Sequence, residues 1–245
     1  MFKRAILKVS GEQLATEGSN FDEALTKRIC LEVDKAIDQG CELSIVVGGG
    51  NIWRGRDARP EMNKARAHQI GIVSTIVNAL YLAEELRIHT NREALVMTPF
   101  DLCAFTTRFE QQEALNAMAT GRVPVFAGGS GHPFVSTDTL VAIRACELEV
   151  DAVLYGKTVP AVYDKDPRKH QGAKMFRSVS YARVIHDNLS VADMSALAIT
   201  HEAGIPCAVF DLAIAESITK ACQGLEALAS IGGSFVSIDS PDEFY

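Results

Sequence analysis

The 245-residue chain lacks the short motifs of several common enzyme classes. It contains no G-x-x-x-x-G-K-[ST] sequence, which excludes the usual P-loop, and no G-x-G-x-x-G follows its first predicted strand, which disfavours a dinucleotide-binding fold. The absence of G-x-S-x-G and H-E-x-x-H removes two hydrolase templates. The six histidines are scattered, without the spacing of a metal site. Another pattern must therefore carry the chemistry.

Signals for secretion, membrane insertion and disulfide bonding are missing as well. The sequence has neither a signal peptide nor an apolar run long enough to span a bilayer, and it has no C-x-x-C pair. Most cysteines lie in apolar runs, which is typical of buried thiols in a reducing compartment rather than of disulfides or metal ligands. The six are Cys30, Cys41, Cys103, Cys146, Cys207 and Cys222. We therefore expect a soluble cytoplasmic protein that does not bind membranes.

The charge balance is mildly acidic. Asp and Glu number 31 against 24 Lys and Arg, which gives a formal net charge of −7. This balance argues against broad binding to nucleic acid, whereas backbone amides and a few basic side chains can still hold a small anion. With 47% hydrophobic residues, the chain can form one large domain or two closely packed lobes.

Short β-branched runs that alternate with helical repeats predict an α/β fold, with a mainly parallel central sheet sandwiched by helices. Strands are predicted over residues 2–9, 43–47, 94–97, 124–127, 150–154, 206–210 and 234–238. Helices are predicted over residues 22–39, 62–87, 110–119, 137–148, 191–202 and 213–222. The apolar residues that recur along the longest helix are Ile70, Val73, Val77, Leu80 and Leu86. Residues 156–190 carry less regular patterning, and their first part, 156–173, could divide two lobes.

Three predicted strand-to-turn junctions combine small residues with groups that suit an anion. They are K-V-S-G-E at residues 8–12, G-G-G-N at residues 48–51 with Arg54 nearby, and residues 128–138. Glycine lets backbone amides approach a ligand without a Cβ in the way, and the carboxyl ends of parallel strands meet at one edge of the sheet. Lysine and arginine add positive charge. Three such turns at successive strand ends indicate a protein that binds a phosphate-bearing ligand.

Each junction also has a simpler interpretation. Lys8 could be a surface lysine, and Arg54 could be a solvated loop charge. The run Ser136-Thr137-Asp138 could serve only to cap the helix that follows it. Gly-rich turns between strands and helices are often matters of topology alone.

Taken together, the junctions resemble the bacterial uridylate (UMP) kinases, a group within the amino-acid kinase superfamily. The resemblance rests on K-V-S-G-E at 8–12, G-G-G-N-x-x-R-G at 48–55, S-G-x-P-F-x-S-T-D at 130–138 and V-Y-x-x-D-P at 162–167. It runs in order from the first strand to about Phe210. Each motif is weak alone, and their order and spacing make the combination specific.

This resemblance implies a phosphotransferase of pyrimidine nucleotide biosynthesis that moves the γ-phosphoryl group of ATP to UMP, giving UDP, with Mg²⁺. It implies one amino-acid kinase-like domain over residues 1–245, with an acceptor-binding part at about 1–150 and an ATP-binding part at about 151–245. It also implies a homohexamer, with GTP and UTP as candidate effectors. The helix over 62–87 would then contribute to subunit contacts, although burial against the chain's own sheet would explain its apolar face equally well.

Carried over position by position, the resemblance assigns catalysis to Lys8, Arg54 and Asp138. Lys8 would contact the transferring phosphoryl group, Arg54 would hold phosphate oxygens where donor and acceptor meet, and Asp138 would orient Lys8. The expected ATP contacts are Lys8, Ser10, Gly11, Gly50, Arg54, Lys157, Tyr163 and Asp166. The expected UMP contacts are Gly49, His68, Ser130, Gly131, His132, Pro133, Phe134, Val135, Ser136 and Thr137. No residue is assigned as a metal ligand.

The sequence departs from the family pattern at both substrate sites. His68 stands where the family usually has an acidic residue near the acceptor ribose, and His132 replaces a common asparagine. In the ATP part, Pro160-Ala161 replaces Asp-Gly, which removes one backbone amide and one glycine. Two alternatives follow, namely an enzyme of the same fold that acts on another acceptor and a non-catalytic nucleotide-binding regulatory paralogue. The intact trio of catalytic candidates favours an enzyme.

Overall fold

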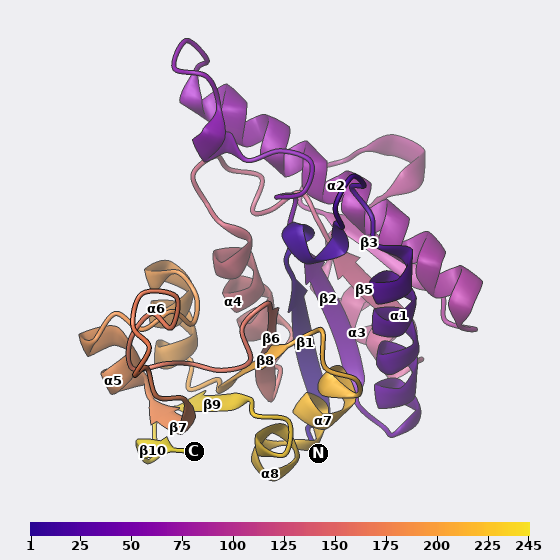
Figure 1. Ribbon diagram of the computed structural model, residues 1–245. Coiled ribbons are helices and arrows are strands. Elements are labelled where there is room, and N and C mark those ends of the chain that lie inside the picture. Colours follow the sequence, from indigo (N-terminus) through magenta and orange to yellow (C-terminus); the bar gives the residue numbers. More distant parts are fainter.

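The computed structural model describes residues 1–245, apart from the side chain of Cys103 (Figure 1). Its strands are β1 (Arg4–Val9), β2 (Glu42–Val47), β3 (Ala94–Thr98), β4 (Thr107–Arg108), β5 (Val123–Phe126), β6 (Ala152–Lys157), β7 (Phe176–Ser180), β8 (Cys207–Asp211), β9 (Ser234–Ser237) and β10 (Glu243–Phe244). Its α-helices are α1 (Glu23–Asp38), α2 (Lys64–His89), α3 (Gln111–Ala119), α4 (Thr137–Glu147), α5 (Tyr181–His186), α6 (Met194–Glu202), α7 (Ser217–Gln223) and α8 (Leu225–Ala229). Each predicted strand and helix is present, with ends that differ by a few residues.

The strands form one sheet in the order β10-β7-β9-β8-β6-β1-β2-β5-β3-β4. The named pairs are parallel except β8 with β9 and β10 with β7, which confirms the prediction of a mainly parallel sheet. Strand β1 lies between β2 and β6, with β2 to β5 on one side of it and β6 to β10 on the other. The strand order therefore reverses at β1, and parallel sheets form ligand crevices at the carboxyl ends of the strands beside such a point.

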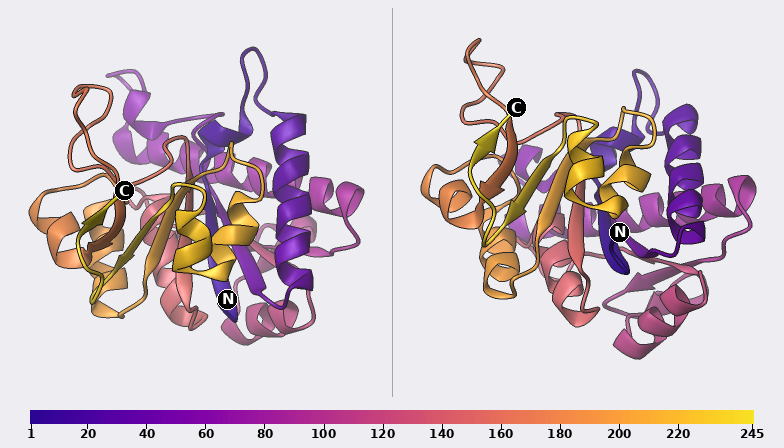
Figure 2. Two further views of the ribbon diagram at one scale, coloured as in Figure 1. Left: turned by 60° about the horizontal axis from the view of Figure 1, so that its bottom comes forward. Right: turned by 90° about the horizontal axis from the view of Figure 1, so that it is seen from below.

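Helices cover both faces of the sheet, as the sequence predicts. Along β1, Leu7 points into the core formed with α1, α2, α7 and α8, whereas Ile6 points into the core formed with α3 to α6. Figure 2 shows α7 and α8, in yellow, beside α1, in indigo, on one side of the sheet. Full burial of one such aliphatic side chain contributes roughly 1.5–3 kcal/mol. The two cores thus hold the strand ends, and the loops that leave them, in defined places.

Helix α2 turns three of its five recurring apolar residues outward, whereas Leu80 and Leu86 pack against the core. Ile70, Val73 and Val77 are 42%, 57% and 45% exposed. Burial against the chain's own sheet is therefore the wrong explanation for these three side chains. The face that packs inward is small or polar at several positions, which include Ala67, Ser74, Thr75, Asn78 and Ala79. A small inward face lets the helix approach the glycine loops closely, because a Cβ on Gly49 would lie 2.9 Å from the carbonyl oxygen of Gly71.

The stretch over residues 156–190 is more regular than its sequence predicts. It contains the end of β6, all of β7 and all of α5, and the last two have only five and six residues. Elements this short cannot display a clear hydrophobic period. Helix α7 begins at Ser217 rather than at 213, because the residues before it form a turn in which Asp211 Oδ1 accepts a hydrogen bond from the amide of Ala213.

The cysteines largely follow the prediction. Free thiols are buried at Cys30, Cys41, Cys207 and Cys222 and half-buried at Cys146, while the prediction for Cys103 lies outside the described side chains. Within the described chain, no helix combines the length and the apolar character needed to cross a membrane.

Candidate functional site

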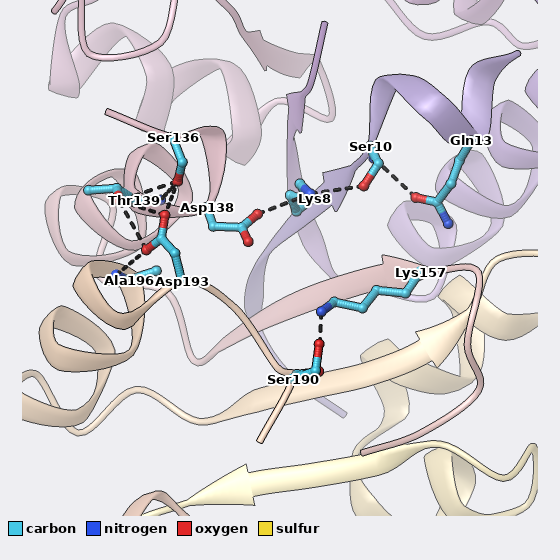
Figure 3. A network of polar contacts seen from close by, with 10 residues as sticks. All are labelled: Lys8, Ser10, Gln13, Ser136, Asp138, Thr139, Lys157, Ser190, Asp193 and Ala196. Atoms are coloured by element: carbon cyan, nitrogen blue, oxygen red, sulfur yellow. Dashed lines mark hydrogen bonds and ion pairs between the residues drawn. The ribbon is translucent and has the colours of Figure 1, made fainter. Parts of the chain in front are cut away.

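Lys8 is a buried lysine near the carboxyl end of β1. Only 8% of the residue is exposed, its Nζ lies 3.0 Å from Oδ1 of Asp138, and it donates a hydrogen bond of 2.9 Å to Oγ of Ser10 (Figure 3). Asp138 belongs to the first turn of α4, so this ion pair joins the central strand to that helix. Lysine is almost never buried without such a partner. The alternative interpretation of Lys8 as a surface lysine is therefore wrong.

The loops after β1 and β2 touch each other. The amide of Gly48 donates a 2.9 Å hydrogen bond to the carbonyl of Val9. A Cβ added to Gly11 would lie 2.5 Å from Oδ1 of Asn51 and 2.6 Å from the amide nitrogen of Gly50. Glycine at position 11 is thus required by the close approach of the two backbones, which brings two sets of amides to the same edge of the sheet.

Gly11→Ala is expected to lower the free energy of unfolding by about 1–3 kcal/mol, because the added methyl group overlaps the backbone of Gly48 and Gly50 as well as the hydrogen-bonded side chain of Asn51. For a chain of this length the thermal midpoint should fall by roughly 2–12 °C in calorimetry. Gly172→Ala is the matched control, since nothing lies within 4 Å of the added Cβ. Equal midpoints for both variants would contradict the packing argument.

Helix α2 anchors the glycine loops through two polar side chains that the sequence interpretation missed. Nδ2 of Asn78 donates to the carbonyl of Gly48 at 2.6 Å and to Oδ1 of Asn51 at 2.7 Å. Oγ1 of Thr75 accepts a 2.7 Å hydrogen bond from the amide of Gly128. The available sequence signal was that these two polar residues lie among the apolar residues of the predicted helix. Their role could not be read from the sequence, because it depends on which face of α2 packs inward.

A larger cavity of about 500 Å³ opens beside Lys8 on the side of the later strands. Among the residues assigned to ATP from the sequence, those in its wall are Lys8, Ser10, Lys157, Tyr163 and Asp166. Asp138 also lines it. The segment after β6 and the segment between α5 and α6 supply most of the remaining wall. The structure thus brings together residues from both halves of the sequence around one hollow.

Lys157 supplies a second ammonium group to the larger cavity (Figure 3). Among the described residues, its Nζ donates a single long hydrogen bond, of 3.5 Å, to the carbonyl of Ser190. Burial lowers the pKa of Lys157 to about 8; the carboxylate of Asp138 opposes this shift and the charge of Lys8 adds to it. An ammonium with so few partners can be stabilised by an anion that enters the cavity.

A smaller cavity of about 130 Å³ lies near the glycine loops. Among the residues assigned to UMP from the sequence, those in its wall are Gly49, His68, His132, Phe134, Val135 and Thr137. The rings of His68 and Phe134 lie against each other with centroids 4.5 Å apart. Phe134 is 64% exposed and has a positive φ of 68°, an uncommon conformation for a bulky residue. The structure therefore brings His68, from α2, to the loop that precedes α4.

Several assigned residues lie outside the wall of the cavity that their assignment predicts. Gly50, assigned to ATP, lines the smaller cavity, and Gly11 lines neither. Arg54 is ion-paired with Glu12 at 2.6 Å and donates from Nε to the carbonyl of Gly50, so it is not a purely solvated loop charge. The acceptor residues outside the wall of the smaller cavity are Ser130, Gly131, Pro133 and Ser136.

Asp193 links α4 to α6 and was also missed. Ser136 caps α4 by accepting a 3.1 Å hydrogen bond from the amide of Thr139, and its hydroxyl donates to Oδ2 of Asp193. Asp193 in turn caps α6 by accepting from the amide of Ala196 at 2.8 Å (Figure 3). An Asp just before a helix is a recognisable N-cap signal. The capping alternative for Ser136 is therefore present in the structure.

The site can neutralise and align phosphates. Two lysine ammonium groups, glycine amides and the first turn of α4 converge on two neighbouring hollows. Among the described side chains, no cluster of three or more His, Cys, Asp or Glu residues is arranged to hold a metal ion. Phosphoryl transfer depends mainly on such positioning and charge compensation, so this arrangement suits it.

The fold has counterparts among solved structures. Residues 3–211 match a model described as the amino acid kinase family. The UMP kinase from Bacillus anthracis superposes with a TM-score of 0.91 at 32% identity, covering 100% of this chain and 99% of that one. The UMP kinase from Ureaplasma parvum gives 0.88 at 30% identity, with 96% and 98% coverage. The uridylate kinase from Archaeoglobus fulgidus shares the fold at 0.73 and 21% identity, with 95% and 99% coverage.

Proposed function

Since this chain belongs to the amino acid kinase family, we propose that it is a UMP kinase, which transfers the γ-phosphoryl group of ATP to UMP and releases ADP and UDP in pyrimidine nucleotide biosynthesis. The observation that carries the proposal is that two cavities meet at the first turn of α4. Thr137 lines the smaller cavity and the next residue, Asp138, lines the larger one. Phosphates bound on the two sides would face each other beside Lys8.

The reaction needs little covalent chemistry from the side chains of the protein. A phosphate oxygen of UMP is itself the nucleophile, so no strong general base is required. The Lys8 ammonium would compensate the charge on the transferring phosphoryl group, and Asp138, 3.0 Å away, would hold Lys8 in place. Backbone amides of Gly49 and Gly50 would bind phosphate oxygens at the wall of the smaller cavity.

The two cavities are lined largely by different parts of the chain. The wall of the smaller cavity comes from residues 49–137, whereas much of the larger wall comes from residues 157–190. We therefore assign UMP to the smaller cavity and to the part at about 1–150, and ATP to the larger cavity and to the part at about 151–245. Gly11, Gly50 and Arg54 would then act at the boundary between the two substrates.

Mg²⁺ would accompany ATP and compensate charge on its phosphates. Mg²⁺ keeps several waters and binds mainly through substrate phosphates, with one or two protein carboxylates at most. A chain whose described side chains form no three-ligand cluster fits a metal that arrives on the nucleotide. Acidic side chains that line the larger cavity are available for the remaining contact.

The exposed apolar face of α2 supports self-association. Ile70, Val73 and Val77 lie on the outer side of that helix and point away from the sheet. Burial of this stripe against other copies is the arrangement that we propose for a homohexamer. Regulation by GTP or UTP and a cytoplasmic location remain predictions.

The test is ADP release from ATP and Mg²⁺ with UMP, CMP, AMP, GMP or no acceptor, run in parallel. UMP alone should stimulate release strongly. Turnover with a different acceptor would favour the same fold with another substrate, an alternative motivated by His68 in the smaller cavity. No turnover with any acceptor, together with measurable nucleotide binding, would favour the non-catalytic alternative motivated by Pro160-Ala161.

A further inference from the structure

Tyr155 lies directly beside Lys8 in the sheet. The two residues are register partners on the parallel strands β6 and β1, so their side chains point to the same face. Tyr155 is fully buried, in the core beneath α4 and α6. Its side chain therefore neighbours that of the lysine that the proposed reaction uses.

The hydroxyl of Tyr155 is an unsatisfied hydrogen-bonding group. Among the described atoms, Oη of Tyr155 is buried without a partner. An unpaired buried hydroxyl is unfavourable, so a buried tyrosine usually has a hydrogen-bond partner for its hydroxyl. Burial raises the pKa of Tyr155 well above its ordinary value, and the charges of Cys207 and Asp138 raise it further. The Asp138 carboxylate is thus electrostatically close to this phenol.

The polar groups near Tyr155 differ in their capacity to accept a further hydrogen bond. Oδ1 of Asp138 is also buried without a hydrogen bond, because Lys8 approaches it as an ion pair whose geometry is not that of a hydrogen bond. Asp193 already accepts from Ser136, Thr139 and Ala196. The other candidate, Cys207, has its sulfur 2.9 Å from the hydroxyl of Tyr181. A free donor and a free acceptor thus remain in the same buried region.

We propose that Tyr155 is a positioning residue whose hydroxyl donates to Oδ1 of Asp138, directly or through one buried water, and so holds that carboxylate toward Lys8. The role in turnover rests on the proposed UMP kinase function. Lys8 itself is held by Oγ of Ser10 and by the carboxylate of Asp138, so its position depends in part on where that carboxylate lies. The hydroxyl of Tyr155 would hold Asp138, the partner of Lys8 in the ion pair. Tyr155 lines neither cavity, so both cavities stay open to substrates.

Tyr155→Phe tests the proposal, because it removes only the hydroxyl. The rate constant kcat should fall about tenfold with KM for both nucleotides unchanged, since misplacement of a catalytic group costs rate rather than binding. The thermal midpoint should fall, because the variant leaves Oδ1 of Asp138 without the hydrogen bond that we propose. The matched control is Tyr181→Phe, which removes a formed hydrogen bond to the carbonyl of Ile205 and should lower the midpoint while kcat is kept. An unchanged kcat in Tyr155→Phe, or a change in KM alone, would overturn the proposal.

A crystal structure of the nucleotide-free wild-type protein separates this proposal from the proposed function. Oη of Tyr155 should lie within hydrogen-bond distance of Asp138 Oδ1 or share an ordered water with it. A hydrogen bond from Oη to Cys207 or Asp193 instead would overturn the assignment, whatever the activity. If the wild-type protein shows no UMP-dependent turnover, the proposed function is wrong. The crystal structure would still decide whether Tyr155 contacts Asp138.

Discussion

Lys8→Ala is expected to reduce kcat for UMP-dependent ADP release by about 10³-fold, because it removes the ammonium group that pairs with Asp138 in the wall of the larger cavity. Asp138→Asn should produce a loss of about 10²-fold or more, since the amide keeps the shape of the side chain but not the charge that holds Lys8. Steady-state rates with saturating ATP and UMP measure both effects. KM should change much less than kcat, because the charge that Lys8 compensates develops during transfer.

The control for these variants is Lys27→Ala, which removes an exposed lysine on α1. It should retain the wild-type rate. Calorimetry should accompany the kinetics, since Lys8 is buried and its loss leaves the Asp138 carboxylate without its ion-pair partner. Full activity in folded Lys8→Ala and Asp138→Asn would remove the catalytic assignment.

The affinity for ATP should weaken as pH rises above about 8. Burial lowers the pKa of Lys157 to about 8 in the nucleotide-free protein, so this ammonium is charged below that pH and neutral above it. ATP phosphates bind the charged form, and above pH 8 binding must also take up a proton. The kcat/KM for ATP should therefore fall up to about tenfold for each unit of pH between 8 and 9.5. Lys157→Met should lower kcat/KM about 10²-fold at pH 7.

Lys157→Arg distinguishes this titration from other groups. A guanidinium stays protonated throughout this range, so the variant should give a flat profile where the wild type declines. The same decline in Lys157→Arg would assign the pH dependence to another group. The measurement is kcat/KM for ATP between pH 6.5 and 9.5 at constant ionic strength, because phosphate binding is sensitive to salt.

Most of the fold could be predicted because its main elements are locally encoded. The strand that ends at Val9 and the run of glycines after Val47 show their boundaries in a few adjacent residues. Long helices such as α1 show a sustained period and a capping residue, Asp22. Strand β7 and helix α5 were missed, because five or six residues carry too little pattern and their stability comes from neighbours distant in sequence.

The candidate site was predictable only in part. Glycine turns and Lys8 stood out because their residue types suit anions at strand ends, whereas the role of Asp138 came from the family resemblance. Asn78 and Thr75 did not, since an amide or hydroxyl on a long helix has no assigned partner until the packed face is known. The exposed apolar stripe of α2 reversed the simplest expectation for the same reason.

The sequence by itself determined the order of the main strands and helices and the parallel α/β class, and it led to the proposed phosphate-binding residues, because these follow from local composition and spacing. Only the tertiary structure decided that Lys8 is buried against Asp138, that the first two glycine loops touch and that Tyr155 lies beside Lys8. Those relations join residues up to 147 positions apart, as Lys8 and Tyr155 show with 155 − 8 = 147. They depend on strand order and register, which long-range packing sets and no local pattern records.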